Sequence, residues 1–201
     1  MNVFINKSKE FLMSIGTTIH YRGYLKDHAS IDACIEAIRN FASKKGWEFE
    51  EFEEKDITID RMYEDDQEKV HEWEYHGPIK GITVNTHETC EDLCFAFDND
   101  LFFQEYVKTQ YAPSDVHVEI INLLRSLQEH TKELVVDDEG QYWDTQDLET
   151  LNANLQETQE LLEEILNDNP SCEGPVWLPD GRIADFVEKD ALEEPAEKSE
   201  E

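Results

Sequence analysis

The sequence predicts an α+β fold of the ferredoxin-like, split βαβ type, in which an antiparallel sheet carries two helices on one face, plus an extra C-terminal acidic helix. Three observations predict this fold. Strand-like and helix-like segments follow one another in the order β-α-β-β-(β)-α-β. Each of the two main helical segments has a single apolar stripe, which a sheet has to cover. The segments between them alternate apolar and polar residues, as half-buried strands do.

The first half of the chain is predicted to start with a strand and a helix. The segment TTIHYRGYL, residues 17–25, alternates between apolar and polar positions. Ser30 suits the N-cap of the helix, and Gly46 is well placed to end it. The apolar face of this helix is formed by Ile31, Cys34, Ile35, Ile38, Phe41 and Ala42. Alternation resumes in WEFEEFEE, residues 47–54, which indicates a second strand.

The middle of the chain contains further strands around a charged segment. Residues 53–77 are rich in charge with scattered aromatic side chains, and we interpret them as an extension or insertion between strands. Strands are predicted at IKGITVNT (79–86) and LCFAFD (93–98), and residues 102–107 are compatible with another strand.

A second long helix and a strand follow. Pro113 suits the first helical turn because its missing N–H would have no partner there. The apolar stripe of this helix consists of Val116, Ile120, Leu123, Leu124 and Leu127. Residues 134–136 are predicted to form a strand that ends at the acidic turn DDEG, residues 137–140, where the glycine can take a positive φ.

An acidic helix and a tail complete the chain. Asp144, three residues before Asp147, resembles an N-cap with a carboxylate at the third position, so we predict a helix from about Thr145. Its leucine-rich stripe can lie on the domain, cover the open face of the sheet or pair with a second copy. The predicted organisation is an N-terminal arm (1–15), an α+β domain (16–144) with a charged insertion (53–77), an acidic amphipathic helix (145–169) and an acidic, partly disordered tail (170–201).

The composition limits the classes of function. The chain has 201 residues, of which 48 are acidic and 17 basic, giving a net charge of −31. This charge argues against direct binding to nucleic acid or to an anionic membrane and favours a basic protein partner. No apolar segment approaches the ~20 residues that span a bilayer, and the N-terminus lacks a signal-peptide core. Because the cysteines also lack the density of a disulfide scaffold, we expect a cytoplasmic protein.

Four short motifs occur in order along the chain, namely TTIHYRG (17–23), KTQYA (108–112), VHVEIINLL (116–124) and VDDEGQYWDT (136–145). Together they resemble a family of uncharacterised bacterial proteins. These proteins share an N-terminal strand-helix unit, a Lys-Thr-Gln-aromatic-Ala step before a helix with an inward histidine, and an acidic Gly-Tyr-Trp turn. The resemblance implies a bacterial cytosolic protein. Since the family has no assigned activity, it implies no site residues.

Histidine and arginine side chains form the first group of candidate site residues. In a ferredoxin-like sheet the first and third strands are neighbours, which would bring His20 and Arg22 close to His87 on the face away from the helices. Such a group could bind an anion or exchange protons. The simpler interpretation, which we favour, is a polar surface covered by the insertion or the third helix. His117 is either a hydrogen-bonded boundary residue of its helix, which is the usual case, or part of a pocket lined also by Lys108 and Gln110.

Metal ligation is a weaker candidate. His87, Cys90 and Cys94 form an H-x2-C-x3-C cluster. A closed zinc site needs four ligands, and no second pair lies nearby in the sequence, so we assign neither a metal nor a cofactor. The carboxylates of the turn around residues 137–144 are explained by turn formation and helix capping rather than by a cation, because their spacing departs from that of an EF-hand.

Two hypotheses of function from different classes follow. The first is a small acidic interaction protein of inhibitor, immunity or adaptor type that binds a basic protein, with a nucleic-acid mimic as its more specific form. Its aromatic anchors would be Trp73, Tyr75, Tyr142, Trp143 and Trp177. The alternative is an enzyme or small-ligand binder that uses His20, Arg22, His87 and His117. A homodimer formed through the helix at 145–167 is a third possibility.

Overall fold

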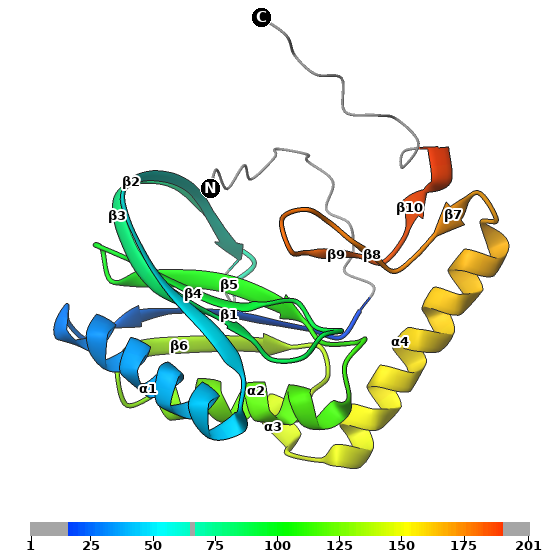
Figure 1. The fold of residues 1–201 in the computed structure, drawn as a ribbon, viewed down its shortest axis with the longest axis horizontal. Coiled ribbons are helices and arrows are strands. Elements are labelled where there is room, and N and C mark those ends of the chain that lie inside the picture. The colour runs from blue at the N-terminus through cyan, green and yellow to red at the C-terminus, as the bar shows by residue number, and fades with distance from the viewer. Residues whose placement is uncertain (1–15, 65–66, 191–201) are drawn as a thin grey trace, which may run out of the picture.

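The computed structural model describes residues 16–64 and 67–190. These residues form an α+β fold with antiparallel sheets and four helices (Figure 1), which confirms the predicted class. The N-terminal arm expected at residues 1–15 and the end of the tail, from residue 191, lie outside the described residues. Within the described ranges, no helix is both long and apolar enough to cross a membrane.

Two three-stranded antiparallel sheets lie side by side at the centre of the fold. The first contains, in spatial order, β5 (Phe102–Lys108), β1 (Thr18–Leu25) and β6 (Thr131–Asp138). The second contains β2 (Glu48–Glu64), β3 (Val70–Asn85) and β4 (Leu93–Asp98). The helices α1 (Ala29–Lys45) and α2 (Ser114–Leu127) lie on one common side of the sheets (Figure 1).

The main hydrophobic core lies between the sheets and these two helices. Side chains alternate along the strands, so that Tyr21 of β1 and Phe95 and Phe97 of β4 join the helices in one buried cluster. The buried residues of α2 are Val116, His117, Ile120, Ile121, Leu123, Leu124 and Leu127. The apolar stripe predicted for this helix is therefore the face that packs on the sheet.

Helix α1 ends as predicted but begins differently. Gly46 takes a positive φ of 74°, and its N–H caps the carbonyl groups of the last turn. At the other end the carboxylate of Asp27 accepts hydrogen bonds from the N–H and the hydroxyl of Ser30, both at 2.9 Å. Ser30 therefore lies inside the first turn and is not the N-cap, and Asp27 accepts one of the N–H groups that have no partner within the helix.

Residues 53–77, which we interpreted as an extension or insertion between strands, extend two paired strands and form the distal part of one long hairpin. Strands β2 and β3 stay paired as far as Glu64↔Val70, with a shift in register between Glu54 and Ile57. Figure 1 shows that the hairpin arches over the side of the sheet that faces away from the helices. Exposed acidic residues separate the inward side chains here, and the alternation is interrupted at the shift in register.

The expected neighbours of the first strand are wrong. We predicted that β1 lies beside the strand that contains Thr83 and Asn85, but the two edges of β1 are taken by β5 and β6. Strand β3 pairs with β2 and β4 instead. The physical reason is that β4 and β5 are separate strands, and the later one takes the position that the sequence analysis gave to β3.

Side chains, rather than a backbone ladder, join the two sheets. Among the described strands, β4 pairs with β3 and β5 pairs with β1. Two guanidinium groups bind carbonyl groups on the facing edge of β5: Arg61 donates to the carbonyl of Gln104 at 3.4 Å, and Arg182 donates to that of Tyr106 at 3.0 Å. Carboxylates accept N–H groups of the same strand, with Asp98 bound to Phe102 at 2.8 Å and Glu91 to Lys108 at 3.0 Å. Arg61 also reaches Asp98 of β4 at 3.3 Å. We call this junction between β4 and β5 the seam.

The C-terminal helix begins later than predicted. A short helix, α3 (Tyr142–Thr145), contains Asp144, and α4 (Leu148–Asp168) follows it. The N-cap of α4 is Asp147, whose carboxylate accepts the N–H groups of the first turn. Of the three positions left open for its stripe, α4 occupies a place on its own domain, because Leu151, Leu155 and Leu162 are buried. It lies at one end of the sheet and not across its open face (Figure 1).

The described part of the tail is folded. Strand β7 (Cys172–Glu173) pairs with β10 (Val187–Glu188), and β8 (Val176–Trp177) pairs with β9 (Ile183–Ala184). These short strands hold Arg182 and Asp185 against the end of β5 and the loop that follows it.

Candidate functional site

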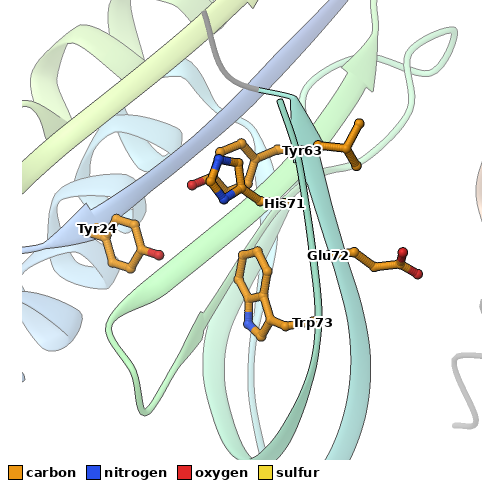
Figure 2. Close-up of a pocket in the computed structure, with 6 residues that line it drawn as sticks. Tyr24, Tyr63, His71, Glu72 and Trp73 are labelled. Carbon is orange, nitrogen blue, oxygen red and sulfur yellow. The ribbon is translucent and has the colours of Figure 1, made fainter. Parts of the chain in front are cut away.

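An aromatic pocket lies between β1 and the distal part of the β2–β3 hairpin. It has a volume of about 370 Å³ and is lined by Tyr24, Tyr63, Val70, His71, Glu72 and Trp73. Figure 2 shows the rings of Tyr24, His71 and Trp73 facing a common space, whereas Glu72 points away from it. We call this site the aromatic pocket.

The pairing of the hairpin strands positions three of the rings. Tyr63 and His71 are cross-strand partners, and their rings stack with centroids 4.8 Å apart. Trp73 is two residues further along β3 and so faces the same side; its ring meets that of Tyr63 edge-on at 6.0 Å. Each of these side chains therefore depends on the hairpin register.

The opposite wall comes from the first sheet. Tyr24 of β1 is paired with Phe102 of β5, and their rings lie 4.9 Å apart. Phe102 is buried beneath Trp73, at 5.1 Å between ring centroids. Burial raises the pKa of Tyr24, and nearby Tyr63, Asp98 and Glu133 raise it further. The phenol of Tyr24 is therefore uncharged at neutral pH.

Two arginine side chains border the pocket, and each has a carboxylate partner. The guanidinium of Arg22 lies 3.9 Å from the ring centroid of Tyr63 and 3.9 Å from the carboxylate of Glu133. Arg61 lies 5.3 Å from the ring centroid of Phe102 and pairs with Asp98 at 3.3 Å. The pocket can therefore hold a flat or cationic group against aromatic faces.

The predicted group of His20, Arg22 and His87 does not assemble. His20 is exposed on β1, with its ring 5.6 Å from that of Tyr106. His87 lies in the loop after β3 and bonds to the hydroxyl of Thr89 at 2.9 Å. Because β1 and β3 are not neighbouring strands, the two histidines do not meet across a ladder. The enzyme hypothesis depended on His20, Arg22 and His87 meeting on one face of the sheet, and it loses this support. Arg22 instead borders the aromatic pocket.

His117 is fully buried and has a structural environment. Its Nδ1 lies 2.8 Å from the hydroxyl of Thr109, and its Nε2 lies 3.1 Å from the carboxylate of Asp138. Asp138 also accepts the N–H groups of Gly140 and Trp143, both at 2.8 Å. Of the two options for His117, the structure shows a hydrogen-bonded residue that ties α2 to the end of β6.

The residues of the weak metal candidate have other contacts. The buried thiol of Cys90 donates to the carbonyl of Lys108 at 3.3 Å, and burial raises its pKa to about 12. Cys94 lies 3.8 Å from the hydroxyl of Thr83. Within residues 16–64 and 67–190, no group of three or more histidine, cysteine, aspartate or glutamate side chains is arranged to hold a metal ion.

The KTQYA motif binds a carboxylate from the tail. Lys108 Nζ lies 3.0 Å from both carboxylate oxygens of Asp185, Gln110 Nε2 donates to it at 2.7 Å, and the hydroxyl of Tyr111 donates at 2.9 Å. In the pocket alternative, Lys108 and Gln110 would line a pocket with His117. They converge instead on Asp185, while Thr109 is the residue of the motif that meets His117.

The five expected aromatic anchors do not form one surface. Trp73 lines the aromatic pocket. Tyr75 is buried and hydrogen-bonded to the carbonyl of Pro78. Tyr142 and Trp143 pack against the main core, where the guanidinium of Arg125 lies 4.7 Å from the Trp143 ring. Trp177, with 48% of its surface exposed, lies apart on the tail.

The sequence analysis missed Tyr24, Tyr63 and His71. The signal was present, because residues 63, 71 and 73 are aromatic at matching positions of two strands. It was not recognised because the segment was interpreted as an insertion and not as a hairpin. The carboxylate of Asp185 left no local signal, since its partners lie about 75 positions earlier in the chain.

Comparison of the chain with protein-family models and with curated proteins gives no match.

Proposed function

We propose that this chain is a small acidic interaction protein, of inhibitor, immunity or adaptor type, which binds a basic protein through the distal part of its β2–β3 hairpin. The main support for the proposal is that apolar side chains are exposed on the outer surface of this hairpin. Met62 and Val70 are 58% and 55% exposed there, among acidic side chains. Apolar side chains surrounded by one sign of charge provide an anchor and a means of steering a partner of opposite charge.

The pairing of the hairpin also supports a role in binding. Asp60 is directly opposite Glu74, and Met62 is opposite Glu72. Glu74 also contacts the ring of His76 at 2.7 Å. The acidic residues at these positions give the outer surface of the hairpin a negative charge, which a basic partner would meet around the exposed side chains of Met62 and Val70.

We also propose that β5, β1 and β6, with α1 and α2, correspond to a ferredoxin-like, split βαβ core. The antiparallel order β5-β1-β6 supports this, with β5 in the place of the third strand of that fold. We further propose a cytoplasmic location. Its support is that all four cysteines are free and that Cys34 and Cys90 are buried.

The test of the binding proposal is retention of proteins from a bacterial lysate on the immobilised full-length chain. We expect a basic protein to be retained at about 50 mM NaCl and released by about 300 mM, where the Debye length is much shorter. The variant Asp60→Lys/Glu74→Lys should lose this protein. The variant Glu163→Lys/Glu164→Lys, which makes the same change in net charge on the exposed face of α4, should keep it.

Two results would contradict the proposal. One is that no basic protein is retained in a salt-sensitive manner. The other is that both variants lose the protein equally, which would show attraction to net charge without a hairpin surface.

A further inference from the structure

The aromatic pocket has a size and composition that suit one side chain of a partner. Its volume of about 370 Å³ is at the lower end of the range for small-molecule sites. Its walls come from both sheets, and Figure 2 shows the rings of Tyr24, His71 and Trp73 around one space. The pocket adjoins the outer surface of the hairpin, because Val70 and Glu72 belong to both.

The charge around the pocket favours a cation. Arg61 is paired with buried Asp98 at 3.3 Å, and Arg22 lies 3.9 Å from the carboxylate of Glu133. Glu72 is then the formally charged residue among those that line the pocket. The neighbouring hairpin positions Glu64 and Glu74 are exposed and acidic as well. A positive group entering the pocket would meet a negative rim and the negative faces of aromatic rings.

Guanidinium groups already stack on aromatic rings in this chain. The carbon atom of the guanidinium lies 3.9 Å from the ring centroid in the pair Arg22–Tyr63 and 4.1 Å in the pair Arg182–Tyr106. Arginine suits such places better than lysine, because its charged group is planar and weakly hydrated. The ring of Tyr63 accepts one guanidinium from within the chain, and the rings of Tyr24 and Trp73 face the pocket.

We propose that the aromatic pocket binds the side chain of an arginine presented by a protein partner. The identity of that partner rests on the proposed function, but the binding of an arginine side chain to the pocket can be measured without it.

The test uses N-acetyl-arginine-N-methylamide as the probe, with the full-length chain and NMR detection of the tryptophan indole N–H signals. The citrulline analogue is the neutral control, and the lysine analogue tests the choice of cation. We expect a saturable shift of the Trp73 signal with a Kd on the order of 1 mM. The citrulline analogue should bind about fivefold more weakly or not at all, because it lacks the charge that the rings attract.

Three variants locate the site. With binding followed by saturation transfer to the probe, Trp73→Leu should abolish binding, and the matched variant Trp177→Leu, on the exposed tail, should leave it unchanged. Glu72→Lys should weaken binding about fivefold through repulsion at the rim. Glu72 points away from the pocket and is exposed, so Glu72→Lys should fold. This variant therefore tests the inference even if Trp73→Leu does not fold.

The inference is overturned by equal binding of the arginine and citrulline analogues, by tighter binding of the lysine analogue, or by a shift at Trp177 in place of Trp73. Failure of the proposed function has a different signature. If the probe binds but no basic protein is retained from lysate, the proposed partner is wrong, whereas the inference that the pocket binds an arginine side chain is supported. If a basic protein is retained but the probe does not bind, the inference on the pocket alone fails.

Discussion

At the scale of single residues, the interaction of His117 with Asp138 is defined by its hydrogen bonds. The hydroxyl of Thr109 donates to the carbonyl of Thr17 at 2.9 Å and lies 2.8 Å from His117 Nδ1. His117 Nε2 faces the carboxylate of Asp138 at 3.1 Å, although its direction is not that of an ideal hydrogen bond. The same carboxylate accepts the N–H groups of Gly140 and Trp143, so Asp138 holds the buried ring against the turn after β6.

Removing one member of this pair should destabilise the protein strongly. We expect Asp138→Asn to lower the free energy of unfolding by about 1–3 kcal/mol, because the amide has one acceptor oxygen where the carboxylate uses two, and a buried N–H group loses its acceptor. Urea unfolding followed by circular dichroism measures this. The neighbouring Asp137→Asn is the control: Asp137 is exposed, so the same substitution should change stability by less than about 0.5 kcal/mol. Equal effects of the two variants would contradict the assignment.

The pair should also make stability depend on pH in the acid range. Burial alone raises the pKa of Asp138, but the hydrogen bonds from His117, Trp143 and Gly140 outweigh it, so the pKa in the folded state lies below its ordinary value. A depressed carboxyl pKa contributes stability above the unfolded pKa of about 3.9, and this contribution is lost as the pH falls through the folded pKa. The difference in urea midpoint between the wild type and Asp138→Asn should thus shrink below about pH 4. A constant difference down to pH 2 would count against this linkage.

At the scale of elements, the sequence predicted the helices and most strands but not their neighbours. The stripe of α2 was correct in full because helical spacing is a local property. Alternation shows which face a residue occupies but carries no information on which strand lies alongside, so the position of β5 beside β1 was not foreseen. The N-cap of α4 was predicted at Asp144 but is Asp147, because both residues have a carboxylate that can cap a helix. Asp144 lies within the short helix α3, which ends before Asp147.

The candidate site was predicted only in part, for the same reason. Trp73 was identified as an anchor and Arg22 as a charged residue of the outward face. The aromatic pocket joins them through the pairing of Tyr63 with His71 and of Tyr24 with Phe102. These are contacts between segments far apart in the chain, which composition and spacing do not reveal.

The tail should detach when its arginine is removed. Arg182 bonds to Glu105 at 2.7 Å and to the carbonyl of Tyr106, and the N–H of Ile183 donates to Glu91, which is 1% exposed. We expect Arg182→Met to increase amide exchange across residues 171–189 by about tenfold or more, since it breaks a charge-assisted contact at the seam. Hydrogen exchange with mass spectrometry measures this. Arg39→Met, at an exposed pair with Glu51, is the control and should leave the tail protected.

At the scale of the whole molecule, the net charge of −31 opposes the compact state through self-repulsion. Added salt screens this repulsion, with a Debye length of about 10 Å at 0.1 M. We therefore expect the melting temperature to rise between 20 mM and 500 mM NaCl, while binding to a basic partner weakens over the same range. Differential scanning calorimetry measures the first effect. A melting temperature that falls with salt would mean that specific ion pairs stabilise the folded state more than the overall repulsion destabilises it.

The seam has a consequence for solubility. The edge of β5 that faces β4 is bound by the guanidinium groups of Arg61 and Arg182, which arrive from a hairpin and a tail far away in the chain. If both groups were withdrawn, the carbonyl groups of Gln104 and Tyr106 on this edge of β5 would lose their donors. A strand edge with unpaired backbone groups can template cross-β aggregation. The two arginines therefore protect the edge of β5 from aggregation. Their joint loss should appear first as insoluble protein and not as a lower melting temperature.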